Sequence, residues 1–225
     1  MQMPAYDEVI QKLDFKKIDG KWFAEKCTLE KIPQQLELDY RTMVETLKDY
    51  VSKTGFKKVL LGLSGGIDSA LVAVIAVDAL GSKNVRCVML PSEYTSKSSL
   101  EDASKIAKNL KCTLSSVPIS EPQSGVKNVL SDLFKGLDPD TTEENIQSRL
   151  RGLLLMAMSN KFGEMLLTTG NKSEVAVGYA TIYGDMSGGY NPLKDLYKTK
   201  VFEISKWRNL THRSWMRGPN TELIN

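Results

Sequence analysis

Residues 59–79 of the chain read VLLGLSGGIDSALVAVIAVDA, and this run determines how the chain folds. Val59–Leu63 is a short apolar segment, which is typical of a buried strand. After the two glycines, residues 70–79 form a longer apolar segment that stops before Gly81, as expected of a buried helix. The run therefore predicts a strand, a glycine turn and a buried helix.

The same alternation of strand and helix extends in both directions from this unit. Upstream, apolar residues recur at helical spacing from Gln34 until Gly55. Downstream, the pattern predicts strands at 85–90, 113–119 and 165–169. Further helices are expected from Ser98, at 125–134 and at 141–162. Because strands that alternate with helices pair in parallel, the expected fold class is α/β, a doubly wound parallel sheet with helices on both faces. Its ligands should bind at the carboxyl ends of the strands.

Two of these helices are expected to begin with capping boxes, in which a Ser or Thr pairs with a Glu three residues later. The candidate pairs are Ser98 with Glu101 and Thr141 with Glu144. In the helix at 141–162, one set of apolar residues is expected to form the packing face: Ile146, Leu150, Leu153 and Ala157.

The composition is that of a globular protein, and it excludes several kinds of site. Hydrophobic residues make up 41% of the chain, and the formal net charge of +3 is too small to indicate a nucleic-acid or membrane partner. The single histidine, His212, cannot build a multi-histidine metal site. The cysteines Cys27, Cys87 and Cys112 form no CxxC motif, which favours reduced thiols in a cytoplasmic protein.

The first residues differ in pattern from the rest. Residues 1–33 mix lysines with acids, show few periodic apolar positions and end at Ile32-Pro33, which disfavours a helix just before it. We expect a linker or remnant here, followed by one domain at 34–225.

The loop Ser64-Gly65-Gly66-Ile67-Asp68-Ser69 lies where the predicted strand passes into the predicted helix. Adjacent glycines let backbone N–H groups approach an anion, the serines add hydroxyl donors, and the helix N-terminus adds partial positive charge. Asp68 would repel a polyphosphate unless a divalent cation lay between them, which predicts Mg²⁺. The alternative is a tight turn in which Asp68 only stabilises the helix dipole.

The SGGIDS string at 64–69 resembles the SGGxDS signature loop of the ATP pyrophosphatases, which have an adenine nucleotide alpha-hydrolase-like fold. These enzymes cleave ATP to AMP and pyrophosphate while they adenylate a carbonyl-type oxygen. Four further strings resemble NAD synthetases, and within that family the glutamine-dependent class: ENIQSRLRG at 144–152, TTGNKSE at 168–174, YGD at 183–185 and NPLKDLYK at 191–198.

This resemblance implies an activity, cofactors and partners. Deamido-NAD would be amidated to NAD through a nicotinate adenylate, with ATP as a substrate, Mg²⁺ as cofactor, and AMP and pyrophosphate as products. Relatives of the glutamine-dependent class carry an amidase domain ahead of this region. This chain is expected to begin near the end of that domain, so nitrogen would come from free ammonia or from a separate glutaminase. A cytoplasmic homodimer is expected. The family also continues past Asn225 with a segment that completes the site.

The resemblance assigns roles to individual residues. Those implied for ATP are Gly62, Leu63, Ser64, Gly65, Gly66, Ile67, Asp68, Ser69, Thr169 and Lys198. Those implied for deamido-NAD are Asn145, Arg149 and Glu174. Asp68 and Glu174 would ligate the metal. Asp185 and Lys198 would be catalytic, Asp185 by orienting ammonia or accepting its proton and Lys198 by neutralising the leaving pyrophosphate.

Alternatives remain both for the roles of single residues and for the function of the chain. Asn145 and Arg149, four residues apart on one helix face, could form a solvated stripe, and Glu174 and Lys198 could be surface charges. The chain could be a noncatalytic or weakly active fragment that retains nucleotide binding. It could also be another ATP pyrophosphatase, such as a tRNA-modifying enzyme, although its small net charge and the absence of an evident working cysteine argue against that. Cys27 is expected to be a linker thiol and not a glutaminase nucleophile.

Overall fold

A computed structural model describes residues 2–25 and 29–220, and the chain divides into two compact units, residues 1–39 and 40–225. Cys27 lies outside the described residues. No helix in the described part of the chain is both long and apolar enough to cross a membrane.

The first unit contains a β-hairpin that the sequence analysis did not identify. Strands β1 (Phe15–Ile18) and β2 (Lys21–Ala24) pair antiparallel, and all their residues are exposed. The connection is Asp19-Gly20, and both residues have positive φ, 49° and 80°. These values match the two-residue type I′ turn, for which Asp-Gly is a preferred sequence.

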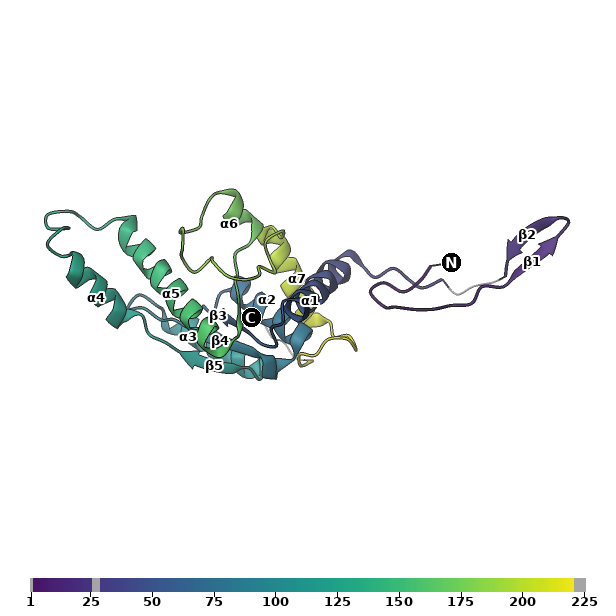
Figure 1. The fold of residues 1–225 in the computed structure, drawn as a ribbon, viewed down its shortest axis with the longest axis horizontal. Helices are drawn as coiled ribbons and strands as arrows, with labels where there is room; N and C mark the ends of the chain where they lie inside the picture. The colour runs from purple at the N-terminus through teal and green to yellow at the C-terminus, as the bar shows by residue number, and fades with distance from the viewer. Residues whose placement is uncertain (1, 26–28, 221–225) are drawn as a thin grey trace. The chain divides into compact units, whose positions relative to one another are not determined.

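The second unit is built on a four-stranded parallel sheet of order β5-β4-β3-β6, of which β3, β4 and β5 are labelled in Figure 1. The strands are β3 (Val59–Gly62), β4 (Val85–Met89), β5 (Thr113–Ser116) and β6 (Met165–Leu167). Each lies where the alternation predicted one, so the expected parallel α/β fold is confirmed. The predicted strand at 113–119 is shorter than expected, because the chain leaves the sheet after Ser116.

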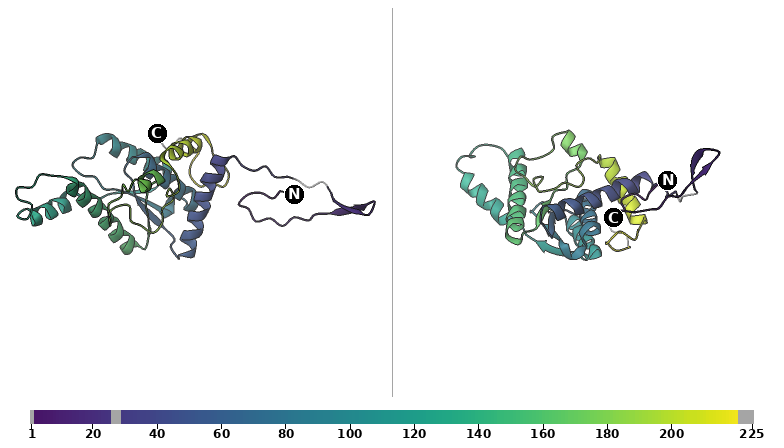
Figure 2. Two further views of the ribbon diagram at one scale, coloured as in Figure 1. Left: turned by 90° about the horizontal axis from the view of Figure 1, so that it is seen from above. Right: turned by 45° about the vertical axis from the view of Figure 1, so that its right-hand side comes forward.

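Helices precede, connect and follow these strands. They are α1 (Gln35–Lys53), α2 (Ile67–Leu80), α3 (Lys97–Leu110), α4 (Ser120–Leu130), α5 (Thr141–Phe162), α6 (Lys172–Ala176) and α7 (Lys198–Leu210), with a short 3-10 turn, η1 (Ser82–Asn84), before β4. Helices α4 and α5 lie side by side (Figure 2). The prediction of a helix at 125–134 was wrong by several residues. The observed helix α4 starts at Ser120 with Pro122 in its first turn, where a proline costs no hydrogen bond.

The core lies on both faces of the sheet. Leu60, Val88 and Leu166 point to one face and pack with Leu155 of α5. Successive strand residues alternate between faces, so Leu61 and its neighbours face the opposite side, where α2 contacts β3 and β4. Helix α2 is buried along nearly its whole length, as its apolar sequence predicted.

Both predicted capping boxes were placed at the wrong residues. Helix α3 is capped by Ser96, whose hydroxyl accepts a hydrogen bond from the Ser99 N–H. Helix α5 is capped by Asp140, which forms the box with Glu143. In both cases a polar side chain upstream of the expected one reaches the free N–H groups.

The packing face of α5 also differs from the expectation. Leu150 is buried as predicted, but Leu153 is 64% exposed and Ala157 is exposed as well. The buried positions are Leu150, Gly152, Leu155 and Ser159. Small residues on this face let the helix approach the loop that contains Gly184. A search for regularly spaced apolar residues does not predict this kind of packing.

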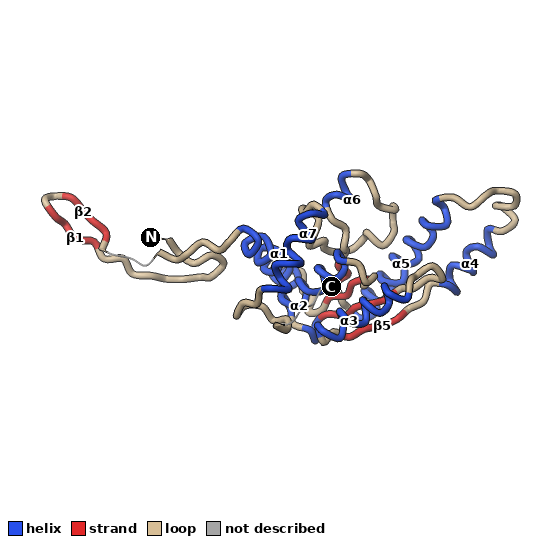
Figure 3. The backbone as a smooth tube through the Cα atoms, turned by 180° about the vertical axis from the view of Figure 1, so that it is seen from behind, coloured by secondary structure: helices blue, strands red, loops and turns tan. Residues whose placement is uncertain are grey.

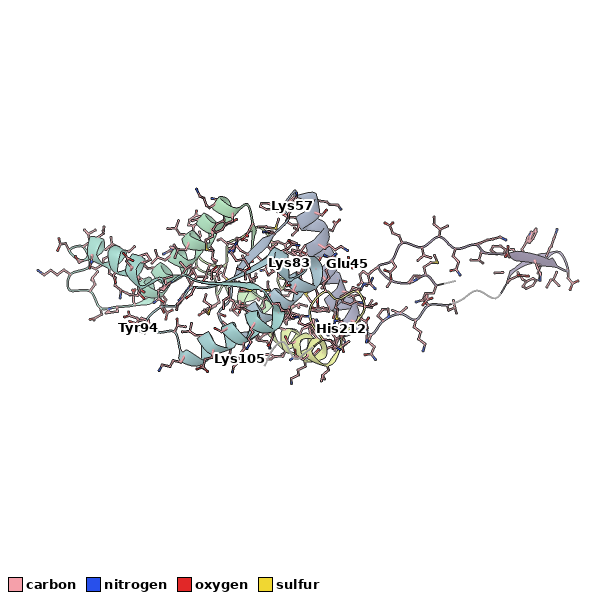
Figure 4. All side chains as sticks on the ribbon, turned by 90° about the horizontal axis from the view of Figure 1, so that it is seen from below. Glu45, Lys57, Lys83, Tyr94, Lys105 and His212 are labelled. Carbon is pink, nitrogen blue, oxygen red and sulfur yellow. The ribbon has the colours of Figure 1, made fainter. Side chains whose placement is uncertain are left out.

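A buried polar network joins α2 to the C-terminal part of the described chain. Asp78 accepts hydrogen bonds from Arg208 Nε at 2.8 Å, Tyr40 Oη at 2.6 Å and Gly218 N at 2.7 Å. Burial, together with the neighbouring Asp78, raises the pKa of Tyr40 well above its usual value. Near this network, His212 Nε2 lies 3.1 Å from the Gly218 carbonyl oxygen (His212 is labelled in Figure 4).

Candidate functional site

The glycine loop connects β3 to α2 and has the tight geometry that its sequence predicted. Gly65 has φ +85°, and a Cβ at this position would overlap the backbone carbonyl of Ser99 at the start of α3. Ser64 and Ser69 hold the loop from within. Their Oγ atoms lie 3.0 Å apart, Gly66 N donates to Ser64 Oγ at 3.2 Å, and Ser69 Oγ donates to the Gly66 carbonyl at 3.0 Å. The two hydroxyls, expected as ligand donors, are therefore part of the loop's own hydrogen-bond network.

A cavity of about 840 Å³ opens at the carboxyl ends of β3 and β4. Its size is that of a pocket for a cofactor-sized ligand. The sequence-predicted residues that line it are Gly62, Leu63, Ser64, Asn145, Thr169, Glu174 and Asp185. The structure thus brings together residues from the glycine loop, α5, the segment after β6 and the loop that follows α6. Tyr94, from the segment after β4, is labelled in Figure 4, and its neighbour Thr95 lines the cavity.

The other predicted site residues lie outside the cavity lining. They are Gly65, Gly66, Ile67, Asp68, Ser69, Arg149 and Lys198. Arg149 is exposed and donates from Nε to the Ile182 carbonyl at 3.2 Å. Although Asn145 and Arg149 share a helix face, only Asn145 reaches the cavity.

Asp68 and Glu174 are joined through Asn171, which is 1% exposed. Asn171 Nδ2 donates to Asp68 Oδ1 at 3.0 Å. Asn171 is also the N-cap of α6: its Oδ1 accepts from Glu174 N at 3.1 Å, and its own N–H donates to Glu174 Oε2 at 2.9 Å. The two carboxylates that the sequence analysis paired therefore contact one intervening residue.

Lys198 lies at the start of α7 and forms an ion pair with Asp68 Oδ2. Its backbone N–H donates to Ser173 Oγ at 3.1 Å, which fixes the start of α7 beside α6. The ammonium lies 5.7 Å from the centre of the Phe202 ring. The lysine, Asp68 and Asn171 therefore form one polar cluster beside the glycine loop.

The loop after α6 is held against α5 by side-chain hydrogen bonds. Residues 177–197 contain no named helix or strand and run as loop between α6 and α7 (tan in Figure 3). Thr181 Oγ1 donates to Asn145 Oδ1 at 2.7 Å, and Ser148 Oγ donates to Asp185 Oδ1 at 2.9 Å. These contacts place the Asp185 carboxylate at the cavity wall.

Sequence reasoning missed three residues that shape the site, Ser148, Arg151 and Asn171. Arg151 lines the cavity and donates from Nε to the Leu90 carbonyl at 3.3 Å, so a fixed cation stands in the wall. All three lie inside the family-like strings at 144–152 and 168–174. The signal was present, but the contacts that give these residues their roles come from segments distant in sequence.

The donor set at Asp68 and Glu174 fits a magnesium ion that shares its ligands with a nucleotide. Mg²⁺ is usually held by one or two carboxylates together with substrate phosphates and water. Each carboxylate oxygen offers two lone pairs, so the hydrogen bonds from Asn171 leave acceptor capacity on both side chains. Among the described residues, no group of three or more His, Cys, Asp or Glu side chains is placed to hold a metal by itself.

With a glycine loop following an inner strand of a doubly wound parallel sheet, the second unit has the adenine nucleotide alpha-hydrolase-like fold of the ATP pyrophosphatase class. Comparison with family models narrows this class. The model described as NAD synthase matches residues 39–225, and the chain belongs to that family.

Individual relatives agree with this assignment. The glutamine-dependent NAD(+) synthetase of Rhodobacter capsulatus is 59% identical over 224 residues, which is 100% of this chain and 41% of that protein. The structure of glutamine-dependent NAD+ synthetase from Acinetobacter baumannii in complex with ADP matches with a TM-score of 0.89 at 43% identity, covering 96% of this chain and 41% of that one. NH3-dependent NAD synthetase from Campylobacter jejuni matches with a TM-score of 0.70 at 32% identity, covering 79% and 75%. The chain thus spans about two fifths of the length of these two glutamine-dependent relatives.

Proposed function

We propose that the chain amidates deamido-NAD to NAD at the expense of ATP. The observation that carries the proposal is the Asp68–Asn171–Glu174 cluster next to the glycine loop, at the edge of a cofactor-sized cavity. Membership of the NAD synthase family supports the same reaction.

In the proposed reaction, a carboxylate oxygen of the nicotinate ring attacks the α-phosphorus of ATP. The bond from that phosphorus to the bridging oxygen breaks, and pyrophosphate leaves. Ammonia then attacks the acyl carbon of the nicotinate adenylate, loses a proton and displaces AMP, which gives the amide. No covalent bond to the protein is required, so catalysis rests on alignment and on neutralisation of negative charge.

Residues in and around the glycine loop bind ATP and the metal. Backbone N–H groups of the loop at 62–69 and the hydroxyl of Thr169 bind ATP, and Lys198 brings a positive charge to the leaving pyrophosphate. Asp68 and Glu174 hold Mg²⁺, which supplies charge neutralisation at the phosphates when bound.

The same cavity binds the second substrate. Asn145 and Glu174 contact deamido-NAD, and Arg149 acts from outside the wall by holding the Ile182 carbonyl in place. Asp185 accepts a proton from the attacking nitrogen once its bond to the acyl carbon has formed, and Ser148 orients the Asp185 carboxylate by a hydrogen bond to Oδ1. Ammonia comes from solution or from the hydrolysis of glutamine. We propose a cytoplasmic homodimer whose catalytic domain is residues 34–225, preceded by a linker at 1–33.

The test is a reaction with the 225-residue chain, ATP, Mg²⁺, deamido-NAD and ammonium, in which pyrophosphate and NAD are both measured. We expect equal amounts of both products, and no pyrophosphate without deamido-NAD. Asp68→Asn should abolish both products, whereas Asp102→Asn, a change on the exposed side of α3, should leave them unchanged. Pyrophosphate release without deamido-NAD would contradict the proposal. ATP binding without NAD formation would favour a nucleotide-binding fragment.

A further inference from the structure

Asn171 is placed to do more than begin a helix. An N-cap side chain needs only an acceptor for a free backbone N–H, and Asn171 Oδ1 fulfils that need by accepting from Glu174 N at 3.1 Å. The other end of the same amide, Nδ2, donates to Asp68 Oδ1 at 3.0 Å across 103 residues of sequence. Helix capping does not account for this second contact.

The contacts of Asn171 fix both carboxylates of the cluster. Asp68 is held by the side-chain amide, and Glu174 is held by the backbone N–H of the same residue at 2.9 Å. Asn171 is 1% exposed, so water does not compete for these hydrogen bonds. As a neutral residue, it adds no charge that would repel a cation or a phosphate.

We propose that Asn171 is a positioning residue that holds Asp68 and Glu174 in the arrangement in which both bind the divalent cation of a metal–ATP complex. This inference rests on the proposed function, because it deepens the metal site named there. Residues that hydrogen-bond to metal ligands fix the orientation of those ligands, and their removal typically lowers metal affinity by about 10- to 100-fold.

The test separates positioning from capping with two substitutions at this position. Asn171→Ser keeps an N-cap acceptor, but its short side chain does not reach Asp68, whereas Asn171→Ala removes both the acceptor and the contact with Asp68. The backbone N–H that donates to Glu174 remains in both variants. Val175→Ala is the matched control, because Val175 lies on the same helix and is 48% exposed. Circular dichroism and the melting temperature establish that each full-length variant is folded.

The measurement is the binding of ATP by calorimetry at a series of Mg²⁺ concentrations. We expect the Mg²⁺ concentration for half-maximal ATP binding to rise by about tenfold or more in Asn171→Ser and in Asn171→Ala. Val175→Ala should bind as the unmodified chain does. The affinity for ATP at saturating Mg²⁺ should return to within about twofold of the unmodified chain in the serine variant, because the ligands themselves remain.

Each outcome decides the matter. If Asn171→Ser has the Mg²⁺ dependence of the unmodified chain, or if only Asn171→Ala is affected, Asn171 is a helix cap and the inference is wrong. If the unmodified chain binds ATP without any dependence on Mg²⁺, the metal site of the proposed function is wrong, and the inference fails with it.

Discussion

Asp68 has two partners at its two oxygens, Asn171 at Oδ1 and Lys198 at Oδ2. The lysine was predicted as a phosphate ligand, and the structure places it on a predicted metal ligand. The two positions are compatible, since a metal–ATP complex would bring phosphate oxygens to this same cluster. The ammonium would then exchange part of its contact with Asp68 for contact with phosphate.

Substitution of Lys198 by Met tests this assignment. Removing a preorganised positive charge that stabilises a leaving group typically lowers kcat by about 100-fold or more. We therefore expect the rate of pyrophosphate formation to fall by that factor. Lys200→Met is the control, because Lys200 lies one half-turn further along the same helix and pairs with Glu203 at 3.2 Å. This substitution should change the rate less than about twofold. Equal rates for the two variants would remove Lys198 from the catalytic group.

The two described cysteines provide a pH-dependent prediction. A hydrogen bond from Cys87 lowers the pKa of the Cys112 thiol, because it stabilises the thiolate. Alkylation of Cys112 by iodoacetamide should therefore have a pH midpoint below that of an ordinary thiol. Cys87→Ala should move the midpoint upward, since only the opposing effect of burial remains, and Cys87→Ser, which keeps a donor, should move it less. Peptide-level mass spectrometry reads this midpoint, and no shift in the alanine variant would contradict the assignment.

Single residues were predictable where local sequence determines their contacts. The glycine loop was found because strand, loop and helix are adjacent in the chain. Asn171 and Ser148 were missed because their hydrogen-bond partners are 103 and 37 residues away. Residue type suggested a polar role for them but not a partner.

Among the elements, the turn before α2 is the most constrained. Gly65 combines positive φ with close approach to the Ser99 carbonyl. Gly163, at the end of α5, has φ +63°, but a methyl group added there would have nothing within 4 Å. At Gly65 both the backbone conformation and the nearby carbonyl disfavour a side chain, whereas at Gly163 only the backbone conformation does.

The two glycines form a matched pair for substitution. Gly163→Ala should cost about 1 kcal/mol of unfolding free energy through backbone strain alone. Gly65→Ala should cost more than about 2 kcal/mol, because overlap with fixed backbone is added to the strain. It should also lower ATP affinity at least about tenfold, since the loop N–H groups are displaced. Urea unfolding and calorimetry measure these effects, and equal costs at both sites would contradict the packing argument.

The sequence predicted elements well where periodicity was strong and poorly where short helices begin in polar segments. Helix α5 has the predicted bounds, Thr141–Phe162. Helices α6 and α7 were not identified, because α6 has five residues and α7 mixes charged with apolar residues throughout. The hairpin β1–β2 was missed because its apolar residues are exposed and carry no buried face for a pattern to reveal.

At the scale of the whole second unit, the Asp78 network fastens the C-terminal part of the described chain to α2. The side chains of Asp78 and Arg208 are 0% and 1% exposed. A buried charge pair is expensive to form, but breaking it leaves an uncompensated charge in the interior.

We therefore expect Asp78→Asn to destabilise the chain by about 3–5 kcal/mol in urea unfolding. The double change Asp78→Asn with Arg208→Met should cost less than the sum of the single changes, because the orphaned cation is removed. As a control, Asp49→Asn breaks a surface pair with Lys53 at 2.7 Å and should cost less than about 1 kcal/mol. Similar costs for the buried and surface substitutions would contradict this account.

The alternation of strands and helices predicted the fold class, but it did not predict the long-range hydrogen bonds of Asp78. Asp78 gave no sign in the sequence of being a buried acid, since it lies in a helix that reads as apolar. Its partner lies 130 residues away, and pattern analysis has no access to such a pairing.

The hydrogen bond between Asp68 and Asn171, and the ion pair between Asp68 and Lys198, have a consequence for biosynthesis. The glycine loop leaves the ribosome more than a hundred residues before its partners do. During synthesis the loop therefore emerges well before Asn171 and Lys198, and both contacts that hold the Asp68 side chain are in place only when the start of α7 has been translated. Asp68 would thus acquire its final orientation late in the synthesis of this region.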